Sequence, residues 1–285
     1  MARPRVLVTG ATGYIASQLL PTFRKRYDLT LVDARAQDRN GQPVEGVTVV
    51  DLGATEPASY RHLFEDITAV VHLAYKHGNK DDLRQGYLDE RDNVDLAFTI
   101  YHAALEAGVE RVVVASSNHA ADWYETLIRA NKLEMLGPYD RALSDNWYGW
   151  AKEAYEHVGF VFACGSLGRK LPVVQIRIGA PREIDVASFQ DNPVGYKRDL
   201  GAYISPRDLA QLFCRSIETP ALENEHGIPF QIFYGISNNS RSFWSIANAR
   251  RVIGYTPEDD SEVRYHDDIA AFLTGEPGKP GKVAG

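Results

Sequence analysis

The sequence predicts an α/β fold built on a doubly wound parallel sheet with helices on both faces. Short apolar runs rich in β-branched residues alternate with helical patterns along the first 178 residues. The runs are continuous, which is typical of strands buried on both faces of a parallel sheet. The first run, Val6-Leu7-Val8, leads directly into a glycine turn. The 285 residues are enough for one large domain that carries an added lobe.

The individual elements follow from this rhythm. The apolar runs predict strands at residues 5–8, 29–32, 47–50, 69–74, 111–115 and 172–178. Apolar residues spaced three and four apart predict helices at residues 13–26, 93–107 and 147–165. Pro21 interrupts the first of these patterns and predicts a kink.

Composition limits the classes of function. The net charge of −7 gives no basic footprint for nucleic acid. Cys164 and Cys214 are far apart and form no C-x-x-C pair, so we expect no metal site and no disulfide framework. No apolar stretch is long enough to span a bilayer, and the first strand begins too early for a signal peptide. These features predict a cytoplasmic enzyme that binds no metal, membrane or nucleic acid.

The glycine turn after the first strand predicts a dinucleotide site. Thr9-Gly10-Ala11-Thr12-Gly13-Tyr14-Ile15 opens a helix, and the free N–H groups of a helix N-terminus bind pyrophosphate. Asp33 ends the second strand, where a carboxylate accepts hydrogen bonds from the adenosine ribose and repels a 2′-phosphate. The sequence therefore favours NAD over NADP, although Arg35 is close enough in sequence to neutralise a 2′-phosphate. The predicted cofactor contacts are Gly10, Thr12, Gly13, Tyr14, Ile15, Asp33, Asp51, Leu52, Leu73, Ala74, Tyr148 and Lys152. For Asp51, bonding to the adenine amino group and capping of the next segment remain equal alternatives.

The rhythm changes after Gly179, which predicts a second region. Residues 180–202 show no clean period, and Ser205-Pro206 is typical of a helix start. Residues 230–234 predict one further strand. We expect a Rossmann-type NAD-binding domain over residues 1–178. Residues 179–285 would form mainly a small substrate-binding lobe, apart from the returning strand. The last residues, 275–285, are expected to be frayed.

Three residues predict proton and hydride chemistry. Tyr148 and Lys152 are four apart in a predicted helix and therefore share one face. A cation beside a phenol favours the phenolate, which can accept a proton from a substrate hydroxyl. Ser117 follows a strand at the sheet edge where α/β folds bind ligands, and its hydroxyl could hold the reacting oxygen. We predict Ser117, Tyr148 and Lys152 as catalytic residues.

These motifs together resemble the extended short-chain dehydrogenase/reductase superfamily of the NAD-dependent epimerase/dehydratase type. Within it, Ala115-Ser116-Ser117-Asn118-His119, Arg177-Ile178-Gly179 and Tyr234-Gly235-Ile236-Ser237-Asn238-Asn239 are similar to segments of the uronate (hexuronate) dehydrogenases. Those enzymes oxidise C1 of a cyclic hexuronic acid with NAD to give a lactone. The resemblance implies the same triad and the same reaction type for this chain.

The resemblance also implies the substrate contacts. Asn118 and His119 would contact sugar hydroxyls, Arg177 would bind the carboxylate, and Ser117 would hold the reacting oxygen. Tyr75 and Lys76 are predicted substrate contacts from their own position after the fourth strand, not from the resemblance. A structural acid is the alternative partner for Arg177, and packing is the alternative role of His119. The chain departs from the family at Ala74–Asn79, between His119 and Tyr148, and after Gly179. Those segments would touch substrate, so the reaction type is expected to transfer better than the identity of the sugar. The basic residues Lys76, His77, Arg177 and Lys197 could suit an anionic sugar, a uronate or another.

Two other functions remain as alternatives. A nucleotide-sugar epimerase would use the same triad to oxidise and then re-reduce one bound intermediate. A non-catalytic cofactor sensor would have no need of all three catalytic residues. The helices at residues 93–107 and 147–165 have apolar positions on more than one face, which favours a homodimer or higher homo-oligomer. The alternative is that both helices only cover the sheet.

Overall fold

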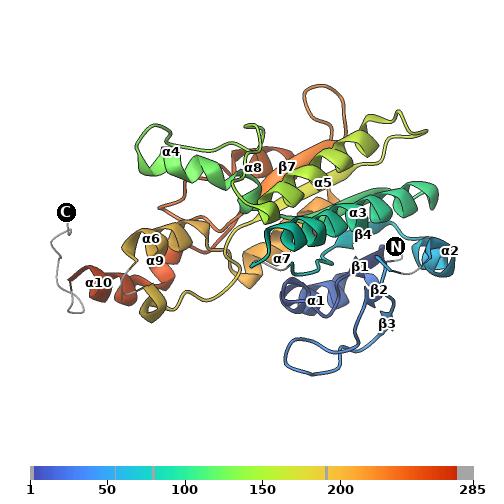
Figure 1. The fold of residues 1–285 in the computed structure, drawn as a ribbon, viewed down its shortest axis with the longest axis horizontal. Helices are drawn as coiled ribbons and strands as arrows, with labels where there is room; N and C mark the ends of the chain where they lie inside the picture. Colours follow the sequence, from blue (N-terminus) through green and yellow to red (C-terminus); the bar gives the residue numbers. More distant parts are fainter. Residues whose placement is uncertain (1–2, 55, 79–80, 190–191, 275–285) are drawn as a thin grey trace.

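A seven-stranded parallel sheet forms the centre of the molecule (Figure 1). The computed structural model describes residues 3–54, 56–78, 81–189 and 192–274. The strand order is β3-β2-β1-β4-β5-β6-β7, and every neighbouring pair is parallel. The strands are β1 (Arg5–Thr9), β2 (Asp28–Asp33), β3 (Val47–Val49), β4 (Ala69–His72), β5 (Arg111–Ser117), β6 (Val173–Ile178) and β7 (Phe230–Gly235). This is the order of a Rossmann-type fold, so the predicted fold class is confirmed.

Helices cover both faces of this sheet. The longer ones are α1 (Tyr14–Arg26), α3 (Leu83–Glu106), α5 (Trp147–Cys164), α6 (Pro193–Ala202), α7 (Pro206–Glu218) and α10 (His266–Thr274). Shorter pieces are α2 (Pro57–Tyr60), η1 (Arg61–Phe64), η2 (Asn118–Tyr124), α4 (Glu125–Arg129), η3 (Val186–Phe189), α8 (Ala247–Ile253) and α9 (Ser261–Arg264). In Figure 1, α3 and α5 run side by side across one face, and α1 lies with α7 against the other.

The core has two layers because successive strand residues face opposite sides of the sheet. Val71 packs with Phe23 and Phe213 in the layer of α1 and α7. Its neighbour Val70 packs with Tyr101 in the layer of α3 and α5. The strand order reverses between β1 and β4, and both neighbouring loops therefore open at the carboxyl edge of the sheet. A ligand crevice is expected at this position in open α/β sheets.

Some of the segments that follow β6 form a separate cluster at one end of the molecule. Helices α6, α9 and α10 lie together at the left of Figure 1, around a small apolar core that contains Tyr196, Tyr203 and Tyr265. The expected helix start at Ser205 is confirmed, since the Ser205 side chain accepts a hydrogen bond from the Asp208 N–H. The strand expected at residues 230–234 is β7, which pairs with β6.

Two helices differ from the sequence prediction. Helix α3 begins at Leu83, ten residues before the expected start, because Asp82 caps it by accepting a hydrogen bond from the Gln85 N–H. Helix α6 lies within the stretch where no period was visible, and Asn192 caps it. Helix α1 continues through Pro21. The expected frayed end at residues 275–285 lies outside the described residues.

Candidate active site

The glycine turn is held against the end of β4 by a close backbone approach. Gly10 has a φ of +70°, and a Cβ there would lie 2.5 Å from the Ala74 backbone nitrogen. Only glycine fits this conformation and this contact. Leu73 and Ala74, both predicted cofactor contacts, therefore lie directly beside the turn.

The start of α1 leaves polar groups available for a ligand. Gly13 caps the helix without a side-chain hydrogen bond, so the first N–H groups, at Tyr14 and Ile15, have no side-chain cap. The Thr12 hydroxyl is buried without a hydrogen-bond partner among the described residues. Asp33 accepts a hydrogen bond from the Thr12 N–H at 2.9 Å, which joins the acidic end of β2 to the glycine turn. These groups form a cradle for a diphosphate.

The two residues after β3 differ in their surroundings. Asp51 accepts hydrogen bonds from the N–H groups of Gly53, at 3.0 Å, and Ala54, at 3.3 Å. This geometry favours the capping alternative for Asp51. The Leu52 side chain is buried in the layer of α3 and α5.

The three predicted catalytic residues come together at the carboxyl edge of the sheet. Ser117 ends β5, while Tyr148 and Lys152 lie in the first two turns of α5. A Cβ on Gly149 would lie 2.1 Å from the His119 carbonyl oxygen, so glycine is needed for η2 to pack against the start of α5. The Lys152 ammonium is buried, donates to the Ala115 carbonyl at 3.1 Å, and lies 5.3 Å from the centre of the Tyr148 ring.

The pKa values of the two α5 residues follow from their burial. Burial raises the pKa of the Tyr148 phenol, the Ser117 side chain opposes this rise, and the charge of Glu90 adds to it. Burial lowers the pKa of Lys152 to about 8, against the charges of Glu90 and Glu156. The expected lowering of the phenol pKa by Lys152 is absent from these shifts. The ammonium lies over the ring of Tyr148, and it donates a hydrogen bond to the Ala115 carbonyl and not to the phenol oxygen.

Two predicted substrate residues follow Ser117 directly. The Asn118 side-chain nitrogen is buried and has no hydrogen-bond partner among the described residues. The His119 ring lies edge-on to the Tyr148 ring, with centroids 5.6 Å apart, and its Nδ1 bonds to Asp122 at 2.9 Å. Asn118 thus has an unused donor beside the triad, and Asp122 fixes the imidazole of His119.

Tyr75 and Lys76 approach the triad from the segment after β4. The Tyr75 ring meets the Tyr148 ring edge-on, with centroids 5.4 Å apart. The Tyr75 hydroxyl donates to the carboxylate of Glu90 on α3, a residue that the sequence reasoning missed. The Lys76 side chain is exposed, with its ammonium 3.9 Å from Asp92.

The structure favours the alternative role of Arg177, which is to pair with a structural acid. Its side chain is fully buried, and its guanidinium donates to Glu156 at 3.0 and 2.8 Å and to the Tyr234 hydroxyl at 3.1 Å. No surface of this side chain is left for a sugar carboxylate. Glu156 is four residues after Lys152, so the same helix face that carries the catalytic pair also carries the acid that binds Arg177.

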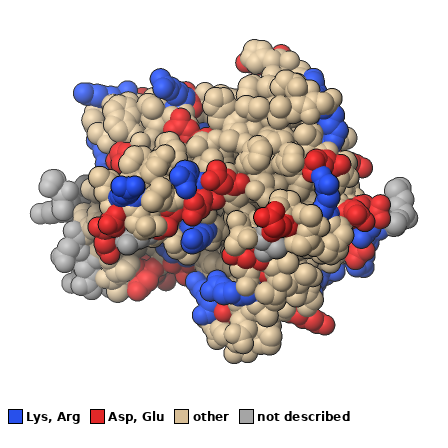
Figure 2. All heavy atoms as spheres, turned by 45° about the vertical axis from the view of Figure 1, so that its right-hand side comes forward, with Lys and Arg blue, Asp and Glu red and all other residues tan. Residues whose placement is uncertain are grey.

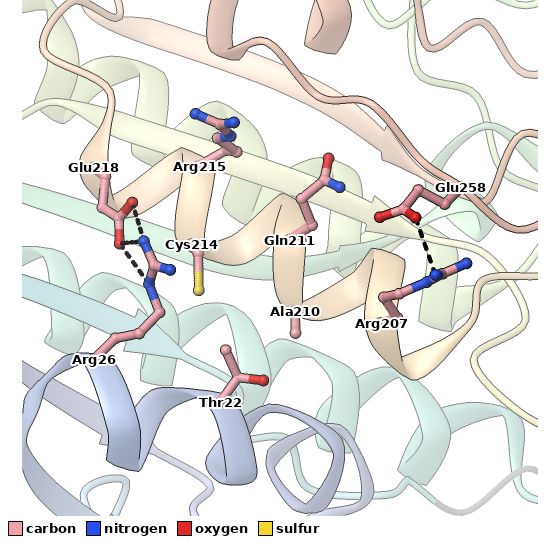
Figure 3. A pocket seen from close by; sticks show the side chains of 9 residues that line it. All are labelled: Thr22, Arg26, Arg207, Ala210, Gln211, Cys214, Arg215, Glu218 and Glu258. Atoms are coloured by element: carbon pink, nitrogen blue, oxygen red, sulfur yellow. Dashed lines mark hydrogen bonds and ion pairs between the residues drawn. The ribbon is translucent and has the colours of Figure 1, made fainter.

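One hollow lies away from the predicted site residues. It has a volume of about 520 Å³ and lies between α1 and α7 (Figure 3). Its charges are largely paired, because Arg26 bonds to Glu218 and Arg207 to Glu258. A smaller hollow of about 130 Å³ is lined by Tyr14 of the cofactor turn.

Charges of both signs are interspersed on the face shown in Figure 2. Among the described residues, no His, Cys, Asp and Glu side chains form a metal-binding group, and no helix is suited to cross a bilayer.

Comparison with known proteins relates this geometry to a family. The model of the NAD dependent epimerase/dehydratase family matches residues 6–161, more than half of the chain. The chain belongs to this family. It is 31% identical to the NAD-dependent glucose-6-phosphate dehydrogenase of Haloferax volcanii, over 90% of this chain and 94% of that protein. It is 29% identical to a uronate dehydrogenase of Pseudomonas putida, over 90% and 85% of the two chains. A crystal structure of the uronate dehydrogenase from Agrobacterium tumefaciens superimposes with a TM-score of 0.71 at 26% identity, covering 98% of this chain and 92% of that one.

NAD is the cofactor of the family, and the residues present fit it. The uncapped start of α1 and the unpartnered Thr12 hydroxyl suit the diphosphate. Asp33 stands at the end of β2, where the adenosine ribose is bound in Rossmann-type folds. The predicted resemblance and the predicted cofactor are both confirmed.

Proposed function

We propose that this protein is an NAD-dependent dehydrogenase that oxidises the C1 hydroxyl of a cyclic anionic sugar, such as a hexuronic acid, to a lactone. The observation that carries the proposal is the convergence of Ser117, Tyr148 and Lys152 at the carboxyl edge of the sheet, the edge that also carries the glycine turn. Ser117 lowers the pKa of the Tyr148 phenol against the effect of burial, and the Lys152 ammonium lies 5.3 Å from the centre of the Tyr148 ring. A hydroxyl, a phenol and an ammonium so arranged suit removal of a proton from an alcohol.

Each side chain of the triad has a distinct proposed task. The Ser117 hydroxyl orients the substrate oxygen, and Tyr148 accepts its proton. Lys152 supplies positive charge beside the phenol, and its hydrogen bond to Ala115 fixes the ammonium. Bound NAD supplies the hydride acceptor. The buried position of Lys152 strengthens its electrostatic effect, because charges interact more strongly away from water.

The segments around the triad support an anionic sugar. The free Asn118 amide nitrogen and the His119 ring are proposed to contact sugar hydroxyls. Since Arg177 is sealed in its ion pair, the exposed Lys76 is the proposed anion contact beside Tyr75. The names of the relatives include a uronate, a sugar phosphate and the neutral sugar L-arabinose, so the anionic class rests on Lys76 and is tested by a screen of free sugars.

A screen of free sugars for reduced cofactor tests the proposal, with uronic acids, sugar phosphates, sulfosugars and neutral aldoses as substrates. We expect the highest rate with an anionic sugar. Tyr148→Phe keeps the ring and removes the base, so kcat should fall by about 10²- to 10⁴-fold. Tyr27→Phe is the matched control, because that hydroxyl bonds to Glu218 at the far end of α1. A Tyr148→Phe variant with full activity would overturn the catalytic assignment.

The epimerase alternative predicts a different outcome of the same screen. An epimerase re-reduces its bound intermediate, so free sugars would yield no net reduced cofactor. Conversion of a nucleotide sugar without net reduction would therefore replace the dehydrogenase proposal.

The overall organisation is also part of the proposal. Residues 1–178 would form the NAD-binding domain together with α7 and β7, which pack with the sheet, and the other segments of residues 179–285 would form mainly the substrate lobe. We propose a homodimer formed through α3 and α5. Phe98 on α3 is 49% exposed and Val161 on α5 is 41% exposed, although these two helices pack against each other.

A further inference from the structure

A carboxylate on α3 is joined to the catalytic pair through a tyrosine. Glu90 is only 5% exposed, and its carboxylate accepts a hydrogen bond from the Tyr75 hydroxyl. The Tyr75 ring lies 5.4 Å from the Tyr148 ring, and the Lys152 ammonium lies 4.8 Å from the centre of the Tyr75 ring. Tyr75 therefore contacts Glu90 with its hydroxyl and the two α5 residues with its ring.

Asn93 holds this arrangement in place. Its side-chain oxygen accepts from the Lys76 N–H at 2.8 Å, and its nitrogen donates to the Lys76 carbonyl at 2.9 Å. The same nitrogen donates to the second carboxylate oxygen of Glu90 at 3.2 Å. The segment that carries Tyr75 is thus tied to α3 at the residue next to Tyr75. Such a doubly bonded segment leaves little freedom for the Tyr75 ring to leave the triad.

None of the described charged and titratable groups around Glu90 neutralises its carboxylate, so Lys152 is the nearby cation that this carboxylate attracts. Burial lowers the pKa of His72 on β4 to about 3, which keeps that imidazole neutral at ordinary pH. The charge of Glu156 on α5 is offset by its ion pair with Arg177. On its own helix, the neighbours of Glu90 are Asp89 and Asn93. Among the described residues, no salt bridge within 4 Å joins Glu90 to a cation, so its attraction to the ammonium acts across the Tyr75 ring.

We propose that Glu90 is a positioning residue which, through Tyr75, keeps the catalytic ammonium of Lys152 charged and sets the pH range in which the triad works. The inference deepens the proposed function and rests on it. Burial alone favours a neutral lysine, and a buried carboxylate nearby favours the ammonium. The electrostatic shifts agree in direction, because the charge of Glu90 raises the pKa of both Lys152 and Tyr148.

The test is the pH profile of kcat/KM for Glu90→Gln, with Glu90→Asp as the conservative variant. Loss of the negative charge should let the phenol and the ammonium both lose their protons at lower pH. Both limbs of the profile should therefore move to lower pH, by about one unit for a lost charge at this range. Glu90→Asp should restore part of the shift. Glu153→Gln is the matched control, because Glu153 adjoins Lys152 on α5 but is not among the charges that shift its pKa.

A spectroscopic readout separates this inference from the proposed function. Ultraviolet difference titration of the substrate-free protein detects tyrosinate, and Tyr148→Phe identifies the signal of Tyr148. That signal should appear at lower pH in Glu90→Gln. Unchanged limbs and an unchanged tyrosinate signal, with Tyr148→Phe inactive, would overturn the role of Glu90 and leave the function standing. An active Tyr148→Phe would overturn the function itself.

A second variant covers the case in which Glu90→Gln does not fold. Tyr75→Phe keeps the ring and removes the hydrogen bond to Glu90. A buried carboxylate that loses a donor takes up a proton more readily, so the limbs should shift in the same direction but less. A lower kcat with unshifted limbs in this variant would show that the pair is only structural and would also overturn the inference.

Discussion

Two glycines determine whether the candidate site can form, because each allows a close backbone contact. Gly10 brings the cofactor turn within contact of Ala74, and Gly149 brings η2 within contact of α5. Neither residue supplies chemistry. Each lacks a Cβ, and a Cβ at either position would clash with the neighbouring backbone and push the two elements apart. Below the same site, His72 is buried at the end of β4 with its Nδ1 2.8 Å from the Thr9 hydroxyl.

His72 makes the stability of the fold depend on pH. Its pKa is lowered from 6.5 to about 3 by burial and by the charge of Lys152. Between these values the unfolded chain binds one more proton, so the free energy of unfolding falls by a few kcal/mol as the pH drops from 6.5 towards 3. Urea unfolding of His72→Asn should show a weaker loss over this range. The exposed His226→Asn is the control and should behave as the unchanged protein does.

Much of the fold and part of the site could be predicted from sequence, for physical reasons. Buried parallel strands leave continuous apolar runs. The glycine turn is informative because a strand precedes it, a helix follows it, and Asp33 ends the next strand. The early start of α3 was missed because residues 83–92 are mostly polar and include Gly86. Glu90 lies in that stretch, and no motif in the sequence marks it. The burial of Arg177 depends on Glu156, whose spacing from Lys152 was the available signal.

At the level of elements, α5 performs two tasks with one face. Tyr148, Lys152 and Glu156 are spaced four apart, so they share that face. The first two belong to the candidate site, and Glu156 bonds to Arg177 of β6 and to the Ser116 hydroxyl of β5 at 2.5 Å. The ion pair thus fixes α5 against the two strands below the triad.

Arg177→Met should destabilise the protein by about 3–5 kcal/mol, because it leaves the buried Glu156 carboxylate unpaired. Arg177→Met combined with Glu156→Gln should recover part of this loss, since no isolated charge then remains. Chemical denaturation measures both effects. A stable Arg177→Met protein that lost affinity only for carboxylated sugars would restore the substrate role that the buried position of Arg177 excludes.

For the whole molecule, the exposed apolar residues of α3 and α5 are the main feature that a single chain leaves unexplained. Phe98 stacks on His102 and approaches Phe162, but half of its surface faces solvent. Both helices already bury their other side against the sheet. A second copy of the same helix pair would cover this face by two-fold symmetry.

Light scattering should therefore give twice the mass of one chain. Phe98→Glu should shift the mass towards that of the monomer, because two-fold symmetry places the new charge in the interface twice. Val194→Glu on α6 is the control, since that side chain is 53% exposed but lies in the other lobe. A monomeric mass for the unchanged protein would contradict the proposed dimer.

The position of β7 in the sequence affects how the chain folds while it is being synthesised. All six residues of β7 are buried beside β6, yet α6 and α7 lie between these two strands in sequence. A nascent chain that has already placed β6 keeps an open hydrogen-bonding edge until residues 230–235 leave the ribosome. Unpaired edges recruit other strands. Products released early, before this last strand, would therefore be prone to self-association even though they contain the entire glycine turn and triad.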